Sequence, residues 1–487
     1  MERKSFWQWV FNNGVTANLI SGAFVAIITW YIWSLLQKFM GGIVNETIAT
    51  AISAVIAAIV VVVCCWSVHK AYLYRQSRVE LKKDKFWSCV QSEEFKRFTV
   101  EVMKRYYGEE FFVSVNGISI PVFVVPGISL PKVRSISDFN ILCDRTSNIT
   151  GFKIADHQGY KTCRYYREYS YVLDGKILYP DRPGYMLDQV HLNGEGVVDK
   201  FSAHVGTFAE NVYSCHVLEY ELYQAYLQYE KALRRGTVES YWQNVMPRME
   251  IRNKIHADVD GMRKGEFQKK MARSLLSGCG RHSLLSVQML VVVRAKSSGT
   301  YEVKIAQRSS KVVISPNIYQ FIPAGGFEIL NDSDDDQYDD KELSENFSPG
   351  CAVFREFLEE LFDVPEFNGN GSGSVVDRVL NDPRIRKINC MLNDGTAEMQ
   401  FLGSVMDLRG LRHELSFVLV IHDPDYSEIQ FLGNEECKKG RVVSIPISKF
   451  DDEKAIWNNL HGPSAAMWGL FKQTKLYEAI RAMETVQ

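Results

Sequence analysis

The six residues from Arg355 to Glu360 constrain the fold of this chain most, because they place three carboxylates within an otherwise apolar helical run. Glu356 precedes Glu359 and Glu360 by three and four positions, so a helix brings all three to one face. Like charges at this spacing repel, whereas Mg²⁺ binds carboxylate oxygens and bridges them to substrate phosphates. Arg355 can instead hold one carboxylate by a forked hydrogen bond. A solvated acidic helix face with one ion pair remains the alternative.

The totals indicate a protein of several units without a general affinity for nucleic-acid polymers. The chain has 487 residues, of which 46% are hydrophobic and 23% charged, and its net charge is −2. This length predicts two to four units, and the charge provides no basic footprint for DNA or RNA. The ten cysteines form no Cys-x-x-Cys pair and no zinc-type spacing with histidines. Free thiols in a reducing cytosol are the simplest interpretation.

Two uncharged apolar segments, residues 19–36 and 48–66, are each long enough to cross a bilayer as a helix. They predict a transmembrane hairpin over residues 1–68, with a pair of buried core helices as the alternative. Lysines and arginines flank the hairpin on both outer sides, so both chain ends are expected in the cytosol. Small residues at helical spacing in both segments suit either packing within the hairpin or self-association between chains.

The next two segments carry no recognisable chemistry. Residues 69–90 are basic and are expected to form a helical linker beside anionic headgroups. Residues 91–280 are predicted to form a mixed α/β domain with strands near its start and a helix from Tyr213 to Arg235, which Gly236 ends. No catalytic motif is present there, so the sequence assigns this domain no role.

The last part, residues 281–487, has a strand-rich pattern. Residues 287–293 and 301–307 are expected to form a hairpin, and Arg308 ends its second strand. Gly325 and Gly326 then allow the backbone to lie close to a ligand. The acidic residues between 332 and 345 are expected to be largely disordered, because like charges with few apolar neighbours cannot bury themselves. After the acidic helix, further strands are predicted at 398–402, 415–421 and 441–445, and a closing helix at 463–483.

This order of hairpin, Gly-Gly turn, Arg-Glu-x-x-Glu-Glu helix, strands and final helix resembles a Nudix domain. The resemblance implies an α/β/α sandwich in which Gly326 and Arg355 occupy the glycine and arginine of the family's box. Two departures affect the box. Gly326 and Arg355 are 29 positions apart (355 − 326), about fifteen more than the family pattern, and Phe362 stands where the pattern has glycine.

The resemblance also implies roles for individual residues. Arg308, Gly325, Gly326 and Arg355 would bind ligand. Glu356, Glu359 and Glu360 would hold Mg²⁺, and Glu359 and Glu360 would be catalytic if the domain hydrolyses its ligand. Because hydrolysis requires metal and water to be placed within narrow tolerances, the departures favour a nucleotide sensor over an enzyme.

The two ends together predict an N-terminal transmembrane hairpin followed by a cytosolic α/β region that ends in the Nudix-like sandwich. This architecture is similar to the two-transmembrane Nudix effectors of CBASS, the bacterial cyclic-oligonucleotide antiphage systems. The similarity implies a multi-pass protein of the bacterial inner membrane. It would sense a cyclic oligonucleotide from a cGAS/DncV-like nucleotidyltransferase, form homo-oligomers and disrupt the bilayer, stopping growth or killing the cell. Two alternatives are a membrane-anchored, Mg²⁺-dependent Nudix hydrolase of a nucleoside diphosphate derivative and an interaction protein without ligand.

Overall fold

The structure is a computed structural model. It describes scattered positions between 30 and 74 and then most of the chain, in residues 80–130, 132–144, 164–173, 183–244, 249–257, 264–310, 312, 317–329, 340–365, 374–429, 431 and 437–485. The chain divides into two compact units, Met1–Ser88 and Cys89–Gln487.

The predicted transmembrane hairpin needs correction. No helix in the described residues is both long and apolar enough to cross a membrane. This finding contradicts the hairpin with spans at 19–36 and 48–66, and with it the location in the bacterial inner membrane. Most of both segments lies outside the described residues. Helix α8 (Val217–Arg235) has the length but carries Glu219 and Glu221 within it. Apolar composition predicts burial in general, whereas a span also requires about 20 consecutive residues of apolar helix.

A mixed sheet forms the centre of the second unit. Its strands follow the order β12-β7-β6-β11-β10-β3, with β8 paired to β7 and β9 to β6. Only the β6–β11 pair is parallel among these. The predicted strands of the last part are present in this sheet. The bounds are β3 (Val122–Pro126), β6 (Ser286–Arg294), β7 (Tyr301–Arg308), β8 (Tyr319–Phe321), β9 (Ala324–Gly326), β10 (Ala397–Asp407), β11 (Arg412–Ile421) and β12 (Cys437–Pro446).

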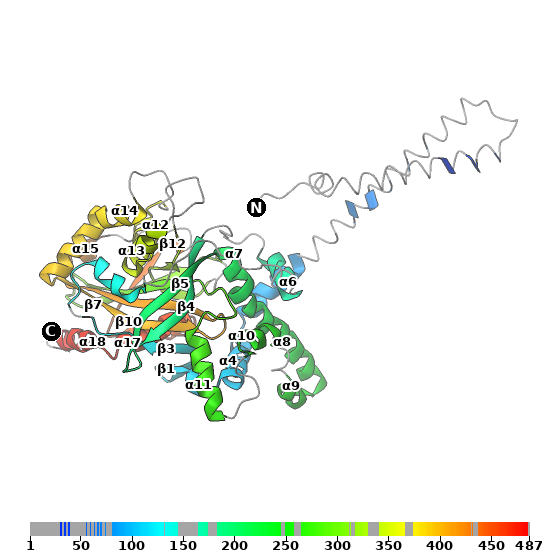
Figure 1. Cartoon of the computed structure of the whole chain (residues 1–487), viewed down its shortest axis with the longest axis horizontal. Coiled ribbons are helices and arrows are strands. Elements are labelled where there is room, and N and C mark those ends of the chain that lie inside the picture. Colours follow the sequence, from blue (N-terminus) through cyan, green and yellow to red (C-terminus); the bar gives the residue numbers. More distant parts are fainter. Residues whose placement is uncertain are drawn as a thin grey trace. The chain divides into compact units, whose positions relative to one another are not determined.

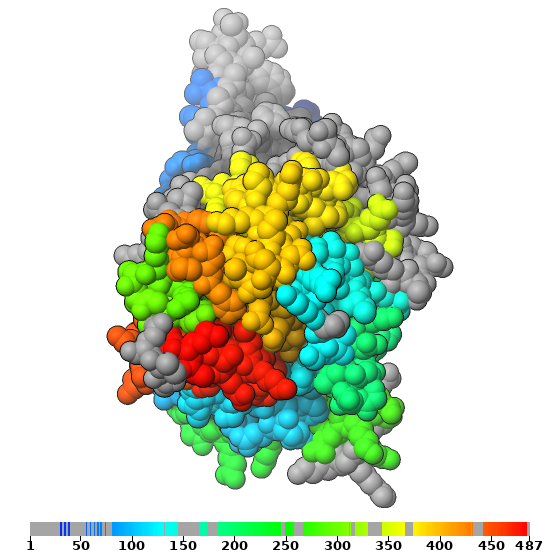
Figure 2. Space-filling model, turned by 90° about the vertical axis from the view of Figure 1, so that its left-hand side faces the viewer, coloured from blue at the N-terminus to red at the C-terminus, as the bar shows by residue number. Residues whose placement is uncertain are grey.

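Helices cover both faces of this sheet, because side chains along β11 alternate between two apolar cores. Phe417 and Leu419 belong to one core, and Val418 and Val420 to the other. The first core contains α13 (Pro349–Phe362), α14 (Val375–Asn381) and α15 (Pro383–Asp394), whereas the second contains α17 (Gly462–Phe471) and α18 (Lys475–Thr485) (Figure 1). Figure 2 views the protein from the side on which the yellow helices near residues 375–394 and the red C-terminal helix reach the surface.

The segment before residue 280 joins the same sheet and core. Strand β3 pairs with β10, so residues 91–280 and 281–487 share one sheet. A long hairpin, β4 (Pro183–Leu192) and β5 (Val198–Thr207), contributes its apolar side chains to the first core. The domain boundaries themselves stay a prediction.

The remaining elements are shorter or surround this core. Helix α8 follows a π-helical turn, η3 (Val212–His216), and ends at Gly236, whose positive φ of 68° suits glycine, which confirms the predicted helix end. Of the predicted acidic disordered segment, residues 332–339 lie outside the described residues, and α12 begins at Asp340. The other elements are α4 (Glu93–Tyr107), β1 (Val113–Val115), β2 (Ile118–Ile120), α6 (Arg164–Val172), α7 (Phe208–Asn211), α9 (Val238–Asn244), α10 (Glu250–Ile255), α11 (Lys264–Leu276), α12 (Asp340–Asn346) and α16 (Lys454–Trp457).

Candidate functional site

Helix α13, which carries the acidic stretch, is set by local signals at both ends. The Ser348 hydroxyl accepts a hydrogen bond from the backbone N–H of Cys351 at 3.3 Å, and Pro349 occupies the first turn, where its missing N–H costs nothing. Asp363 ends the helix in the left-handed region with a φ of 51°. The predicted helix is therefore confirmed, with its face of buried side chains in the first apolar core.

Arg355 is 4% exposed and joins α13 to the chain that follows β9. Its guanidinium donates to the carbonyl oxygens of Gly326, the last residue of β9, at 2.9 Å and of Glu328 at 3.2 Å, and it also contacts the Glu356 carboxylate. Its Nε lies 3.9 Å from Oε1 of Glu359. Burial lowers the pKa of Arg355, but these neighbouring carboxylates outweigh burial and hold that pKa above its usual value. Arg355 therefore cross-links the fold as a permanent cation.

The carboxylates of α13 also contact protein groups. Glu356 lies against the α-carbon of Gly325, so closely that a Cβ there would come within 3.0 Å of the carboxylate. Burial raises the pKa of Glu356 to about 8; Arg355 lowers it and Glu359 raises it. Glu360 is 1% exposed, and its Oε2 accepts the backbone N–H of Ala324 at 2.8 Å. The backbone of β9, which contains Gly325 and Gly326, therefore contacts the side chains of Glu356 and Glu360.

These residues do not fit the predicted magnesium site. Within the described ranges, no group of three or more His, Cys, Asp or Glu side chains is arranged to hold a metal ion. Glu356, Glu359 and Glu360 therefore do not converge on one point, and Arg355 places a cation where a metal would need negative charge. No step of a reaction can be derived through Mg²⁺ with this arrangement.

Arg308 belongs to a different part of the sheet. It is 9% exposed at the end of β7 and donates to Oε1 of Gln320 at 2.6 Å. Its charge acts on Glu414 and His461. The structure therefore brings Gly325, Gly326 and Arg355 together, as predicted, and places Arg308 beside a second group of residues.

That second group lines a cavity of about 60 Å³, here called the β10–β11 cavity. It lies where β10 ends and β11 begins, against η3, the first turn of α8 and the start of α17. The sequence interpretation missed it, because its residues come from three distant segments. The sequence signal that could have indicated this cavity is the pair Arg412 and Glu414, two charged residues at alternate positions of an otherwise apolar strand. The lining residues are Cys215, His216, Glu219, Asp407, Arg409, Gly410, Arg412, Glu414 and His461.

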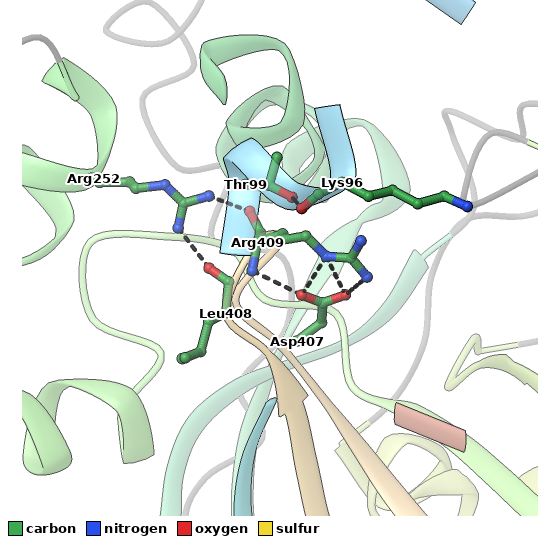
Figure 3. A network of polar contacts seen from close by, with 6 residues as sticks. All are labelled: Lys96, Thr99, Arg252, Asp407, Leu408 and Arg409. Carbon is green, nitrogen blue, oxygen red and sulfur yellow. Dashed lines mark hydrogen bonds and ion pairs between the residues drawn. The ribbon is translucent and has the colours of Figure 1, made fainter. Parts of the chain in front are cut away.

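An ion pair shapes the rim of the β10–β11 cavity. The Arg409 Nε lies 2.9 Å from both carboxylate oxygens of Asp407 (Figure 3). Burial raises the pKa of Asp407, but Arg409 outweighs burial and lowers that pKa overall. Buried Arg252 donates to the carbonyl oxygens of Leu408, at 2.6 Å, and of Arg409, which fixes the turn between the strands. Asp407 and Arg409 therefore offset each other's charge at the rim, and Arg252 holds the backbone of the turn.

The side chains deeper in the β10–β11 cavity have shifted pKa values. Burial raises the pKa of Glu414 to about 7 and lowers that of Arg412. Burial also lowers the pKa of His461 to about 3 and that of His216 well below its usual value. At neutral pH the histidines are neutral, Glu414 is partly protonated and Arg412 is a cation in a poorly solvated place.

Comparisons with known proteins identify no family. No family model matches the sequence, and no curated protein matches it. Among solved structures, the chain is similar to a NUDIX hydrolase from Alicyclobacillus acidocaldarius, with 12% identity over 39% of this chain and 90% of that chain and a TM-score of 0.23. The chain thus shows a distant structural likeness to a Nudix hydrolase, and a TM-score this low supports nothing finer.

Proposed function

We propose that the Cys89–Gln487 unit is a nucleotide sensor that binds a phosphate-bearing ligand without cleaving it. The observation that supports this proposal is the role of Arg355 and the acidic residues of α13 in the fold. Arg355 joins Gly326, Glu328 and Glu356, and Glu360 accepts the N–H of Ala324. The residues that a hydrolase would direct at metal and water here hold helix and strand together.

The charges favour binding over hydrolysis. A metal-dependent hydrolase needs ionised carboxylates around one cation. Burial raises the pKa of Glu356, which disfavours its ionised form, and the charge of Arg355 opposes a second cation. The second candidate, a Mg²⁺-dependent Nudix hydrolase, is favoured only by the order of elements.

The proposed ligand is a nucleotide, with a cyclic oligonucleotide from a cGAS/DncV-like nucleotidyltransferase as the first candidate. The resemblance that suggested cyclic oligonucleotides drew partly on the membrane hairpin, which is corrected above, so linear nucleotides form a second arm of the test. A sensor must also change state. A ligand drives self-association only if it binds the assembled form better than the single chain, and we include homo-oligomerisation in the proposal.

The test uses the full chain with a panel of cyclic di- and trinucleotides and linear nucleoside diphosphate derivatives, with and without Mg²⁺. Chromatography of the recovered nucleotides shows what is retained and what is cut, and sedimentation follows assembly. We expect one nucleotide to be retained intact, with an affinity independent of Mg²⁺, and to increase the sedimentation coefficient.

Glu359→Gln separates the two candidate functions, and Glu453→Gln, at an exposed position, is the matched control. A sensor retains its ligand in both variants. Conversion of a linear diphosphate to two monophosphates with Mg²⁺, lost in Glu359→Gln and kept in Glu453→Gln, would establish the hydrolase and refute the sensor.

A further inference from the structure

The last turn of helix α18 contacts Tyr301, the buried first residue of β7, at two atoms. The backbone N–H of Tyr301 donates to Oε1 of Glu484 at 3.1 Å. The phenol O–H of Tyr301 lies 3.7 Å from Sδ of Met483. Glu484 also accepts a hydrogen bond from Arg481 at 2.9 Å, within the same helix. The C-terminal helix is therefore held at its last turn by one backbone contact and one phenol contact.

The same phenol has a second acceptor in His422, which directly follows β11. The O–H of Tyr301 lies 2.8 Å from Nδ1 of His422, and the two rings meet edge to face with their centroids 5.8 Å apart. The other ring nitrogen of His422, Nε2, lies 3.3 Å from Oε1 of Glu398 in β10. Tyr301 thus has a single O–H hydrogen and two acceptors within reach, and a well-aligned hydrogen bond goes to one of them at a time.

The Glu398 carboxylate decides which nitrogen of a neutral His422 carries the hydrogen. The hydrogen bond with His422 holds the pKa of Glu398 below its usual value, so this carboxylate is ionised above about pH 5 and can only accept. Nε2 of His422 must therefore carry the hydrogen, which leaves a lone pair on Nδ1. In this state the O–H of Tyr301 donates to His422, and the sulfur of Met483 receives no hydrogen from it.

A proton gained by His422 reverses this arrangement. The His422 side chain is 18% exposed, so it can take the proton from solvent. In the imidazolium both ring nitrogens carry hydrogens and neither accepts. Nδ1–H then donates to the Tyr301 oxygen, and the O–H of Tyr301 turns toward Sδ of Met483. The charge of one imidazole thereby determines whether the phenol bonds to the sheet or to the C-terminal helix.

We propose that His422 is a pH-dependent switch on the docking of α18. With His422 protonated, Tyr301 donates to Met483 and holds the last turn of the helix, and with His422 neutral that contact is released. The contact of Glu484 with the backbone does not depend on this proton, so the switch changes how firmly the helix end is held. The inference is independent of the proposed function, since none of these residues belongs to β9 or α13 or lines the β10–β11 cavity.

The other ionisable groups around the switch keep their charge while it operates. Histidine side chains ordinarily change charge between about pH 5 and pH 8, whereas carboxyl groups titrate below this range and tyrosine, lysine and arginine above it. A change in α18 within this range therefore points to the histidine. Among the described residues, the groups that act on Tyr301 or Glu398 or adjoin His422 are Lys132, Arg294, Asp423 and Glu484.

The experiment is hydrogen–deuterium exchange of the full chain, read by mass spectrometry on residues 475–485 and corrected for the intrinsic pH dependence of amide exchange. One added hydrogen bond slows local opening by about threefold. We therefore expect the protection of this segment to rise about threefold from pH 8 to pH 5, with the change centred on the titration of His422. His422→Gln, Tyr301→Phe and Met483→Leu should each abolish this rise.

His204→Gln is the matched control, because it removes a histidine that is also bonded to a carboxylate. His204 lies in β5 and its Nδ1 is 2.7 Å from Oδ1 of Asp188, so it makes no part of the contact with α18. The rise in protection should be kept in this variant. A rise that is lost in His204→Gln as well would mean that the segment follows global stability, and it would overturn the switch.

Met483→Leu gives the sharpest outcome, because Met483 is 49% exposed and a leucine there leaves the buried core unchanged. Protection that stays constant or falls from pH 8 to pH 5 in the wild type overturns the proposal, and so does an equal rise in Met483→Leu. If Tyr301→Phe does not fold, since its site is buried, Met483→Leu and His422→Gln still decide.

Discussion

Replacing Gly325 by alanine tests whether the Gly-Gly strand exists to accommodate Glu356. Gly325 lies in β9 opposite Val287 of β6, so pairing fixes its backbone. An added Cβ would come within 3.0 Å of the carboxylate carbon and both carboxylate oxygens of Glu356. The carboxylate must move, and it cannot move freely because Arg355 holds it.

The magnitude follows from the contact that must break. A hydrogen bond between charged groups contributes about 1.5–3 kcal/mol. Gly→Ala at a compatible backbone position otherwise stabilises by about 0.4–1 kcal/mol, through the unfolded state. We therefore expect Gly325→Ala to lower the free energy of unfolding by about 1–2 kcal/mol. Gly194→Ala, in an exposed turn where nothing lies within 4 Å of the added Cβ, should be neutral or slightly stabilising.

A double-mutant cycle with Glu356→Ala isolates the cause, using urea unfolding and hydrogen exchange of residues 324–362. If Glu356 is the obstacle, Gly325→Ala costs little once that side chain is truncated, and the two changes couple by about 1.5–3 kcal/mol. Additivity within about 0.5 kcal/mol would refute the reasoning. It would mean that the glycine serves another purpose, such as close approach of a ligand.

Two further predictions concern the β10–β11 cavity and its rim. Burial raises the pKa of Glu414 from 4.5 to about 7, so the folded state keeps this proton to higher pH than the unfolded state, and the stability that the protonated group contributes is lost as pH rises from about 4.5 to about 7. In urea unfolding, the stability of Glu414→Gln relative to the wild type should therefore increase by about 3 kcal/mol between pH 5 and pH 8. A difference that stays constant with pH would contradict this. Arg252→Met should lower the free energy of unfolding by about 3–5 kcal/mol, because it leaves buried Glu221 without its cation and two carbonyl oxygens without a donor. Adding Glu221→Gln should recover part of this loss in thermal unfolding. No recovery would exclude the ion pair as the cause.

Local signals in the sequence sufficed for several elements. Ser297-Ser298-Gly299, between the apolar run 287–293 and the alternating run 301–307, predicted the hairpin that the structure shows, with Arg294 paired to Tyr301. Gly236 ended its helix as expected. Each of these features depends on residues within a few positions of one another, and backbone preferences and hydrophobic periodicity act over that distance.

Other features could not be read from the sequence pattern alone. The three carboxylates of α13 share a helix face, which suggested a metal site, but Arg355 and the backbone of β9 occupy them. Apolar composition suggested two membrane spans, and no described helix is both long and apolar enough to cross a membrane. For α13 the pattern was present, and its interpretation depended on partners that the pattern does not specify.

The sequence by itself determined where helix α13 begins, which residues face its core, and that three carboxylates and an arginine share its surface, because these follow from spacing along one helix. Only the tertiary structure decided that Arg355 pairs with Glu356 on this face, and that His216, Arg412 and His461 meet in one cavity. The physical reason is that electrostatic and hydrogen-bonding roles depend on distances of a few ångströms between groups that lie far apart along the chain. Those distances exist only once the sheet has brought the distant segments together.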